Sequence, residues 1–188
     1  MREDKPYVLG IGGTTRPGSS TERALAAALL AAEAAGARTR MLTARQLALP
    51  MYAPGVTERS PAALEFLAEV ARADSLVIAS PAYHGSVSGL LKNAIDYLED
   101  LRDAEPPYLD GRAVGCVVCA YGWQGTVTAL GGLRSIIHSL RGWPTPLGVT
   151  VNSALPVFGA DGEIRDAETA ARLDLLGRQV VQFALARR

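Results

Sequence analysis

The chain of 188 residues is long enough for one compact domain, and 48% of its residues are hydrophobic, which is ordinary for a globular core. Its 19 Lys and Arg residues balance 19 Asp and Glu residues, so no basic excess indicates a nucleic-acid partner and no acidic tract indicates a disordered tail. No apolar stretch reaches the roughly 18–20 residues that a membrane span requires.

The chain begins with a charged segment, residues 1–6, and then enters an apolar run. A signal peptide needs a basic start followed by a long apolar core and a small-residue cleavage site, and this segment has no such order. We therefore expect no signal peptide, no membrane partner and a cytoplasmic protein.

The first third of the chain predicts strand, helix and strand in turn. Residues 7–12 form a short apolar run typical of a buried strand, and the Gly-, Thr- and Ser-rich residues 13–20 are expected to be a loop. Ala, Leu and Glu favour a helix over residues 21–35, with Gly36 where a helix C-terminal glycine is expected. Residues 39–43 are a candidate second strand, and residues 44–59 an irregular connection.

The middle of the chain repeats this alternation. Ser60 is a good N-cap with Pro61 at the first helical position, and Leu64, Leu67, Ala68 and Ala71 then form an apolar stripe at helical spacing. Residues 75–80 are the third predicted strand, residues 81–87 a loop, and residues 88–101 a helix.

The last third continues the pattern after a surface connection over residues 103–112. Residues 113–120 are the fourth predicted strand, residues 121–125 a loop, and residue 126 caps a helix that ends near residue 142. Residues 145–151 are the fifth strand, residues 156–162 a loop and residues 167–186 the final helix. Five uniformly apolar strands alternating with five helices predict an α/β fold, a single domain over residues 1–188 whose parallel sheet is buried on both faces.

The two cysteines, Cys116 and Cys119, are spaced as C-x-x-C but lie inside the fourth predicted strand. Positions i and i+3 of a strand point to opposite faces, whereas a redox pair normally sits at a helix N-terminus. We expect two buried cysteines and no disulfide.

In a parallel sheet of this kind, ligands bind at the carboxyl ends of the strands, which directs attention to three loops. The loop over residues 13–21 holds five hydroxyl residues and Arg16 and leads into a helix, an arrangement that suits a phosphate group. The alternative is a polar loop with a capping box, because Ser19 and Glu22 stand three residues apart. The glycines fit neither the nucleotide P-loop nor the G-x-G-x-x-G pattern.

The other two loops are rich in aromatic and small residues. Residues 80–89 include Tyr83 and His84 without a charged side chain, which suits a flat ring with polar edges; the alternatives are a turn whose tyrosine packs on the core and a partly buried histidine. Residues 121–126 place Tyr121 and Trp123 between glycines, which suits stacking on a heterocycle or, alternatively, a protein interface. No G-x-S-x-G motif, metal-ligand spacing or carboxylate pair is present, so we expect no metal.

These loops together resemble those of the NAD(P)H-dependent FMN reductase family of flavodoxin-like proteins. The family signature Gly-Ser-x-Arg-x-x-Ser-x-Asn is similar to the sequence from Gly13 to Thr21. A Pro-x-Tyr loop followed by Ser/Pro-Gly-x-Leu-Lys-Asn-x-x-Asp is similar to the sequences from Pro81 to Tyr83 and from Ser88 to Asp96. The resemblance covers nearly the whole chain and implies a flavodoxin-like three-layer sandwich with a five-stranded parallel sheet of order 2-1-3-4-5.

The resemblance also implies a bound FMN, with NADPH or NADH as co-substrate, and assigns residues to it. The phosphate would be held by Thr14, Arg16, Ser19, Ser20 and Thr21. The isoalloxazine ring would be lined by Pro81, Ala82, Tyr83, His84, Gly85 and Ser86, and its pyrimidine side bordered by Tyr121, Gly122, Trp123 and Gly125. The signature residues Lys92, Asn93 and Asp96 are expected to be structural or to lie at a subunit interface. Three positions differ from the family pattern: Thr14 replaces Ser, Thr21 stands where Asn is common, and His84 where Asn is frequent.

The implied activity is hydride transfer from the nicotinamide to FMN and on to a small-molecule acceptor such as a flavin, a quinone, an azo compound or a metal ion. The flavin carries this chemistry, so no catalytic side chain is expected. One alternative is a one-electron carrier, although such flavodoxins tend to be strongly acidic; another is a phosphate-binding domain without flavin. The resemblance further implies a homodimer or homotetramer. The helix over residues 88–101, with Leu90, Leu91, Ile95, Tyr97 and Leu98, and the segment 106–108 are a candidate interface, unless these residues face only the sheet.

Overall fold

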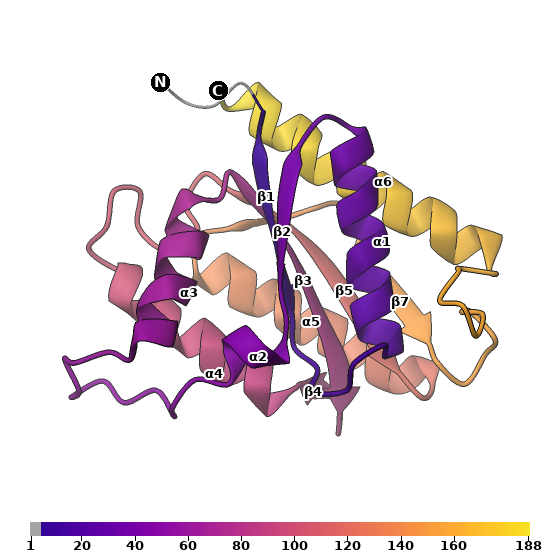
Figure 1. Cartoon of the computed structure of the whole chain (residues 1–188), viewed down its shortest axis with the longest axis horizontal. Coiled ribbons are helices and arrows are strands. Elements are labelled where there is room, and N and C mark those ends of the chain that lie inside the picture. The colour runs from indigo at the N-terminus through magenta and orange to yellow at the C-terminus, as the bar shows by residue number, and fades with distance from the viewer. Residues whose placement is uncertain (1–4) are drawn as a thin grey trace.

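The computed structural model describes residues 5–188 and shows a central sheet between two layers of helices (Figure 1). Most of the charged segment at the start of the chain, residues 1–4, lies outside the described residues, so the expected lack of a signal peptide stays a prediction. In residues 5–188, no helix is both long enough and apolar enough to cross a membrane.

The sheet contains the five predicted parallel strands in the predicted order, with two additions. The strands are β1 (Tyr7–Gly12), β2 (Arg38–Leu42), β3 (Ser75–Tyr83), β4 (Ser86–Val87), β5 (Ala113–Ala120), β6 (Trp143–Pro144) and β7 (Val149–Asn152). The parallel order is β2-β1-β3-β5, and β6 and β7 both pair with β5. The fifth predicted strand, residues 145–151, is thus shorter than expected: only β7 lies within it and pairs with the end of β5, while β6 precedes it and pairs with the start of β5.

The second addition is β4, which pairs antiparallel with the end of β3. The expectation that residues 81–87 form a loop was wrong, because β3 continues through Pro81 to Tyr83. Proline lacks an N–H group and is unusual inside a sheet. Here it stands opposite Cys119, near the carboxyl end of the β3–β5 pairing.

The helices match the predicted ones with small shifts of their ends. They are α1 (Ser20–Ala34), α2 (Ala44–Leu47), α3 (Pro61–Arg72), α4 (Gly89–Asp96), the 3-10 helix η1 (Tyr97–Leu101), α5 (Trp123–Ser139) and α6 (Ala167–Ala186). The short α2 lies in the segment expected to be irregular. The final helix has the predicted bounds, and Ser60 caps α3 by accepting a hydrogen bond from the N–H of Ala63.

Helix α5 begins four residues earlier than expected. Thr126 was predicted to be its N-cap, but the cap is Gly122, whose φ of 133° is open to glycine and rare for other residues. The hydroxyl of Thr126 instead donates to the carbonyl of Trp123 inside the first turn.

Each face of the sheet has its own hydrophobic core. Helices α1 and α6 cover one face, and α3, α4 and α5 cover the other (Figure 1). Cys116 belongs to the core under α3–α5, and Cys119 to the core under α1 and α6. Both are free and buried, so the prediction that they point to opposite faces is confirmed.

The apolar stripe expected on α3 was assigned to the wrong face. Leu67 is buried as predicted, but Leu64 is 56% exposed, and the other core residues of this helix are Phe66 and Val70 with Ala63. The sequence hides this face because it also contains Glu69, which is buried and accepts a hydrogen bond from Tyr7. Arg40 pairs with the same carboxylate at 2.8 Å, so the buried charge is compensated.

Candidate functional site

A cavity of about 650 Å³ lies where the carboxyl ends of β1, β3, β5 and β7 meet the start of α1. It is the cavity that brings together residues from all three predicted loops. It is lined by Thr14, Arg16, Gly18, Ser19, Ser20, Thr21, Arg23, Pro81, Ala82, Tyr83, Cys119, Ala120, Tyr121 and Ser153. All five predicted phosphate residues line it, together with Pro81, Ala82, Tyr83 and Tyr121 from the other two loops.

The loop after β1 is folded by its own hydroxyl and carboxylate groups. Ser19 is the N-cap of α1 and accepts a hydrogen bond from the N–H of Glu22 at 3.3 Å. Glu22 accepts from the N–H of Gly18 at 2.6 Å, and Thr14 accepts from the N–H of Arg16 at 3.2 Å. The capping alternative is therefore real, and both Ser19 and Thr14 form hydrogen bonds within the loop. Within residues 5–188, the hydroxyls of Thr15 and Ser20 form no such bond.

The first turn of α1 presents backbone donors to this cavity. A helix has no internal acceptor for the N–H groups of its first turn, which here include those of Ser20 and Thr21. These donors and the positive end of the helix dipole favour an anion at this end of the cavity.

Two arginines stand beside these donors. Arg16 is exposed, and within residues 5–188 no carboxylate forms an ion pair with it. Arg23 donates to the carbonyl of Gly159 at 2.8 Å, which fixes it across the loop before α6. Arg16 is thus the guanidinium that remains available for a bidentate contact with a phosphate.

Thr21 lies at the floor of the cavity and is only 2% exposed. Its hydroxyl partly opposes the effect of burial on the pKa of the Cys119 thiol. Burial raises the pKa of that thiol to about 12, so the thiol is protonated at neutral pH. The cavity therefore contains a cysteine with no thiolate character.

The Pro81–Ser86 segment forms a hairpin, and only its first half lines the cavity. His84 and Gly85, with φ values of 52° and 80°, make the two-residue tip between β3 and β4. Both residues of such a primed turn need a left-handed conformation. His84, Gly85 and Ser86 are not among the residues that line the cavity, whereas Tyr83 lines it and is 58% exposed.

The loop after β5 contributes one aromatic residue instead of two. Tyr121 lines the cavity and is 87% exposed. Gly122, Trp123 and Gly125 cap or begin α5 and do not line it. Trp123 faces a neighbouring cavity of about 380 Å³ that also contains Leu155.

Five lining residues were missed by sequence reasoning: Gly18, Arg23, Cys119, Ala120 and Ser153. A signal existed for Ser153, since it directly follows the fifth strand and every carboxyl end of a parallel sheet opens at the same edge. Arg23 gave no signal, because a charged residue in the first turns of a helix is usually solvated.

Comparison with known proteins identifies the family. The family model described as NADPH-dependent FMN reductase matches residues 6–155. The chain belongs to this family. An FMN-dependent NADPH-azoreductase of Staphylococcus aureus is 34% identical over 114 residues, which are 59% of this chain and 56% of that protein. The match thus spans little more than half of the curated relative.

Solved structures share the fold over nearly the whole chain. The flavoenzyme NAD(P)H:(acceptor) oxidoreductase FerB from Paracoccus denitrificans has a TM-score of 0.78 at 18% identity and covers 97% of this chain and 98% of its own. A flavodoxin-type, WrbA-like protein from Agrobacterium tumefaciens has a TM-score of 0.66 at 15% identity, covering 98% of this chain and 99% of its own. The predicted flavodoxin-like architecture is confirmed.

The second signature of the family joins two walls of the cavity. The hydroxyl of Ser88 donates to the carbonyl of Gly13 at 2.6 Å, and its N–H donates to the hydroxyl of Ser80 at 3.0 Å. A Cβ at Gly13 would lie 2.6 Å from the Cβ of Leu91, so only glycine permits this close approach. Ser88 therefore fixes the loop after β1 against the end of β3.

In the rest of that signature, Asn93 has the structural role that was one of the two expectations, and an interface role of Lys92 and Asp96 stays a prediction. Asn93 is buried; its amide donates to the carbonyls of Leu49 and Pro50 and accepts from the N–H of Tyr52, which anchors the irregular segment after α2. Lys92 and Asp96 form an i,i+4 ion pair on the helix surface.

Proposed function

We propose that the protein binds FMN in the cavity at the carboxyl ends of the strands and catalyses hydride transfer from NADPH or NADH to this flavin. A small-molecule acceptor would then take the electrons. One observation carries the proposal: a single cavity contains both a helix N-terminus with Arg16 beside it and a wall of strand ends with two exposed tyrosines. The chain that forms this cavity is a member of the FMN reductase family.

The donor set fits the phosphate of FMN. The N–H groups of Ser20 and Thr21, the hydroxyls of Thr14 and Ser19, and the guanidinium of Arg16 lie around one end of the cavity. Hydrogen bonds of this kind to a charged acceptor contribute about 1.5–3 kcal/mol each. Thr21 would contribute its N–H, which lies in the first turn of α1.

The ring end of the cavity suits a flat heterocycle. Pro81 and Ala82 are half-buried strand residues, and the backbone of β3 turns into the hairpin directly after Tyr83. Backbone N–H and C=O groups at such a strand end recognise the polar edge of a ring, while the small side chain of Ala82 lets the ring approach. Tyr83 and Tyr121 would border the ring from two different strands.

The flavin supplies the redox chemistry when bound: it accepts a hydride and passes the electrons on. The residues of the chain bind and orient it, and none of them needs to act as acid, base or nucleophile. The lining of the cavity agrees with this division, since its one thiol has a pKa of about 12 and no carboxylate lines it. Tyr83 and Tyr121, both more than half exposed, would leave one face of the ring open for nicotinamide and acceptor in turn.

The acceptor would be a flavin, a quinone or a related conjugated compound. The curated azoreductase makes an azo compound a reasonable first acceptor to examine. We also propose that two or four copies assemble, although most of the apolar residues expected to form an interface on α4 and η1 are not exposed; Leu90 is half-buried. Leu91, Ile95, Tyr97 and Leu98 are buried in the chain's own core. Size-exclusion chromatography with light scattering would measure the assembly, and cell fractionation would examine the predicted cytoplasmic location.

The deciding experiment is a visible absorption scan with FMN under anaerobic conditions, before and after addition of NADPH or NADH. We expect FMN to bind and the absorbance band of the oxidised flavin, at ~450 nm, to bleach within seconds as the flavin accepts a hydride. Bound flavin that stays oxidised would replace this proposal with a one-electron carrier. Failure to bind flavin would remove both and leave only an anion site at α1.

A further inference from the structure

We propose that the cavity beside Trp123 binds the adenine ring of NADPH or NADH while the nicotinamide of the same molecule reaches the flavin. This inference rests on the proposed function. The cavity, of about 380 Å³, lies at the carboxyl end of β7, and residues from the first turns of α5 and α6 line it. Its volume is within the range of about 300–1,000 Å³ that is usual for small-molecule sites.

The chain passes between this cavity and the proposed flavin cavity at two places. After β5, Tyr121 lines the flavin cavity and Trp123, two residues later, lines this one. At the end of β7, Asn152 lines this cavity and the next residue, Ser153, lines the flavin cavity. Two short pieces of chain therefore form a wall that the cavities share, which suits a dinucleotide with one ring on either side of it.

Trp123 provides a stacking surface in this cavity. Its side chain is 52% exposed, and Leu155, which lines the same cavity, is 49% exposed. Neither residue belongs to the two hydrophobic cores, and within residues 5–188 no other aromatic ring stacks on Trp123. A flat base that enters between them would remove both side chains from water and stack on the indole.

The same cavity offers hydrogen-bonding groups that have no partner in the chain. Thr150 and Asn152 stand two residues apart on β7, so their side chains point to the same face. Asn152 is only 7% exposed, and its Oδ1 accepts a hydrogen bond from the N–H of Ala154 at 3.0 Å. Within residues 5–188, its NH2 group and the hydroxyl of Thr150 form no hydrogen bond. Because buried amides are nearly always paired, this NH2 group is a donor left for a ligand, and the ring nitrogens of adenine accept such bonds.

The charges around the cavity favour a neutral base over a second anion. Arg165 and Arg172 line it together with Asp166 and Glu168, so the formal charges balance. Glu168 pairs with Arg172, and Asp166 caps α6 by accepting from the N–H of Thr169 at 2.7 Å. Adenine is neutral, and its amino group can donate to a carboxylate, whereas a quinone has no donor to offer.

The first experiment compares two hydride donors in the FMN-saturated Trp123→Ala variant. Reduced nicotinamide mononucleotide carries the same nicotinamide as NADPH and NADH but no adenosine. We expect the KM for NADPH or NADH to rise about fivefold or more at nearly constant kcat, and the KM for the mononucleotide to stay unchanged. Trp143→Ala is the matched control, because Trp143 is the second of two tryptophans, is 58% exposed and lines a different cavity.

The second experiment measures binding without turnover. In the Trp143→Phe variant, Trp123 is the sole tryptophan, so its fluorescence reports on this cavity alone. Adenosine is the probe, because it has no phosphate that could compete for the site at α1, and the titration is done at saturating FMN. We expect a saturable change of fluorescence at millimolar adenosine, and Asn152→Ala should shift it to higher concentrations.

Three results would overturn the proposal. One is an unchanged KM for NADPH and NADH in Trp123→Ala, or an equal rise for the mononucleotide. Another is a rise confined to the KM of the electron acceptor, which would assign the cavity to that substrate. The third is the lack of any saturable response to adenosine. If none of the hydride donors reduces the flavin in the unsubstituted chain, the proposed function itself fails, and the adenosine titration still decides whether this cavity binds a base.

Discussion

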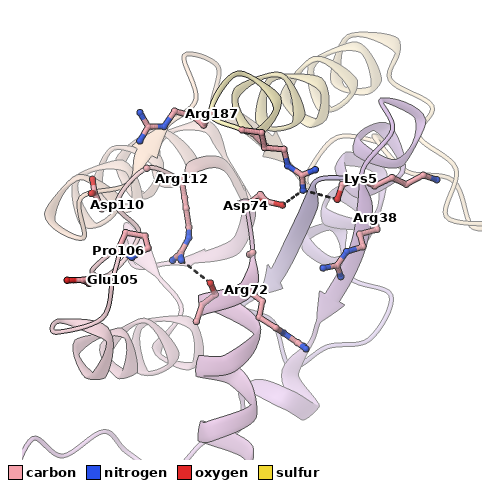
Figure 2. A pocket seen from close by; sticks show the side chains of 14 residues that line it. Lys5, Arg38, Arg72, Asp74, Glu105, Pro106, Asp110, Arg112 and Arg187 are labelled. Atoms are coloured by element: carbon pink, nitrogen blue, oxygen red, sulfur yellow. Dashed lines mark hydrogen bonds and ion pairs between the residues drawn. The ribbon is translucent and has the colours of Figure 1, made fainter. Parts of the chain in front are cut away.

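The two edges of the parallel sheet carry cavities of similar size, about 650 Å³ and 520 Å³, that offer positive charge in different ways. At the carboxyl edge, the donors include backbone N–H groups at the start of α1, with hydroxyls and Arg16 beside them. At the amino edge, the second cavity lies among the starts of the strands and the C-terminal ends of α3 and α6, and the donors are long cationic side chains, with Arg112 at their centre (Figure 2). Among residues 5–188, no aromatic side chain lines the second cavity, whereas two tyrosines line the first.

The difference follows from the direction of the helices. In a parallel α/β fold each helix runs back against its strand, so helix N-termini gather at the carboxyl edge and C-termini at the amino edge. The first edge would therefore bind an anion with preorganised backbone groups, whereas at the second edge the cationic side chains stand beside two negative helix ends. Ordering such side chains costs up to about 2 kcal/mol each, so a more selective and tighter site is expected at the carboxyl edge.

The largest expected effect concerns the thiol in the carboxyl cavity. The pKa values of Cys116 and Cys119 are raised to about 12 by burial, so at pH 8 each carries roughly a thousandth of the thiolate of a free cysteine. A thiol reagent such as DTNB should react ~1,000-fold more slowly with the folded protein than with the unfolded one. A fast reaction that disappears in the Cys119→Ala variant would contradict this prediction and show that Cys119 is a reactive thiol at the carboxyl edge.

The same thiols predict how stability depends on pH. Their pKa is higher in the folded chain than in the unfolded one, so the folded state holds more protons above about pH 9. Their contribution to the free energy of unfolding is therefore fully present below this pH and is lost as the pH rises from about 9 towards 12. Denaturant titrations at several pH values would measure the loss, and the Cys116→Ala variant should show less of it.

Arg16→Ala tests the contrast between the edges directly. Loss of a bidentate contact to a phosphate should weaken FMN binding by about 2–3 kcal/mol, which is a factor of roughly 30–150 in Kd. Arg187→Ala removes the same charge at the other edge and should leave FMN affinity unchanged. Fluorescence titration of FMN would compare the two variants; equal weakening would show that the edges are not independent.

Helices α1 and α6, which run between the two edges of the sheet, pack closely against each other at Gly177. A Cβ at Gly177 of α6 would collide with the backbone carbonyl of Ala28 and the side chain of Ala31 in α1, and a backbone atom cannot yield cheaply. Gly177→Ala should therefore lower the free energy of unfolding by about 1–3 kcal/mol. Gly131→Ala is the matched control on α5: its Cβ would meet open space, so the same exchange should stabilise by about 0.5–1 kcal/mol. Thermal unfolding of both variants measures the difference; a shift of the same sign would contradict it.

Sequence reasoning succeeded where a local rule and the global fold agree. Residues 167–186 form α6 as predicted, and the Ser60-Pro61 start of α3 holds, because caps and Ala- or Leu-rich helices are decided by neighbouring residues. The opposite faces of the cysteines were also predictable, since they depend on strand alternation, and so was the place of the hydroxyl-rich loop at the cavity. The order of the sheet came from the family resemblance.

It failed where a distant contact decides the outcome. The buried face of α3 includes Glu69, whose charge is compensated by Arg72 of the same helix and by Arg40 and Tyr7 from neighbouring strands. The cavity at the amino edge was not predicted, since its cations come from segments as far apart as Lys5 and Arg188. The net charge of zero did not indicate this cavity, because acidic residues elsewhere in the chain balance the cationic side chains at the amino edge.

The smallest predicted effect is at His84, which the family resemblance places beside the flavin and the structure places at the hairpin tip. The left-handed φ of 52° at His84 is easily adopted by Asn, and Asn-Gly is the preferred sequence of such a two-residue turn. This backbone requirement accounts for a frequent Asn at this position without any contact to the ring. His84→Asn should therefore raise the free energy of unfolding by about 0.5 kcal/mol, and His84→Val should lower it by about 1–2 kcal/mol, because a β-branched residue resists this conformation.

Flavin binding distinguishes the two interpretations of His84. If it only forms the turn, His84→Asn changes the Kd for FMN less than twofold and leaves the visible spectrum of the bound flavin unchanged across pH 5–8, the range in which histidine titrates (~6.5). A spectrum or a reduction rate that depends on pH in the parent chain, and loses that dependence in His84→Asn, would instead put the imidazole against the ring. The cavity at the carboxyl edge would then have the His84 imidazole at its entrance. The two edges would differ in the ionisable groups they contain as well as in the source of their positive charge.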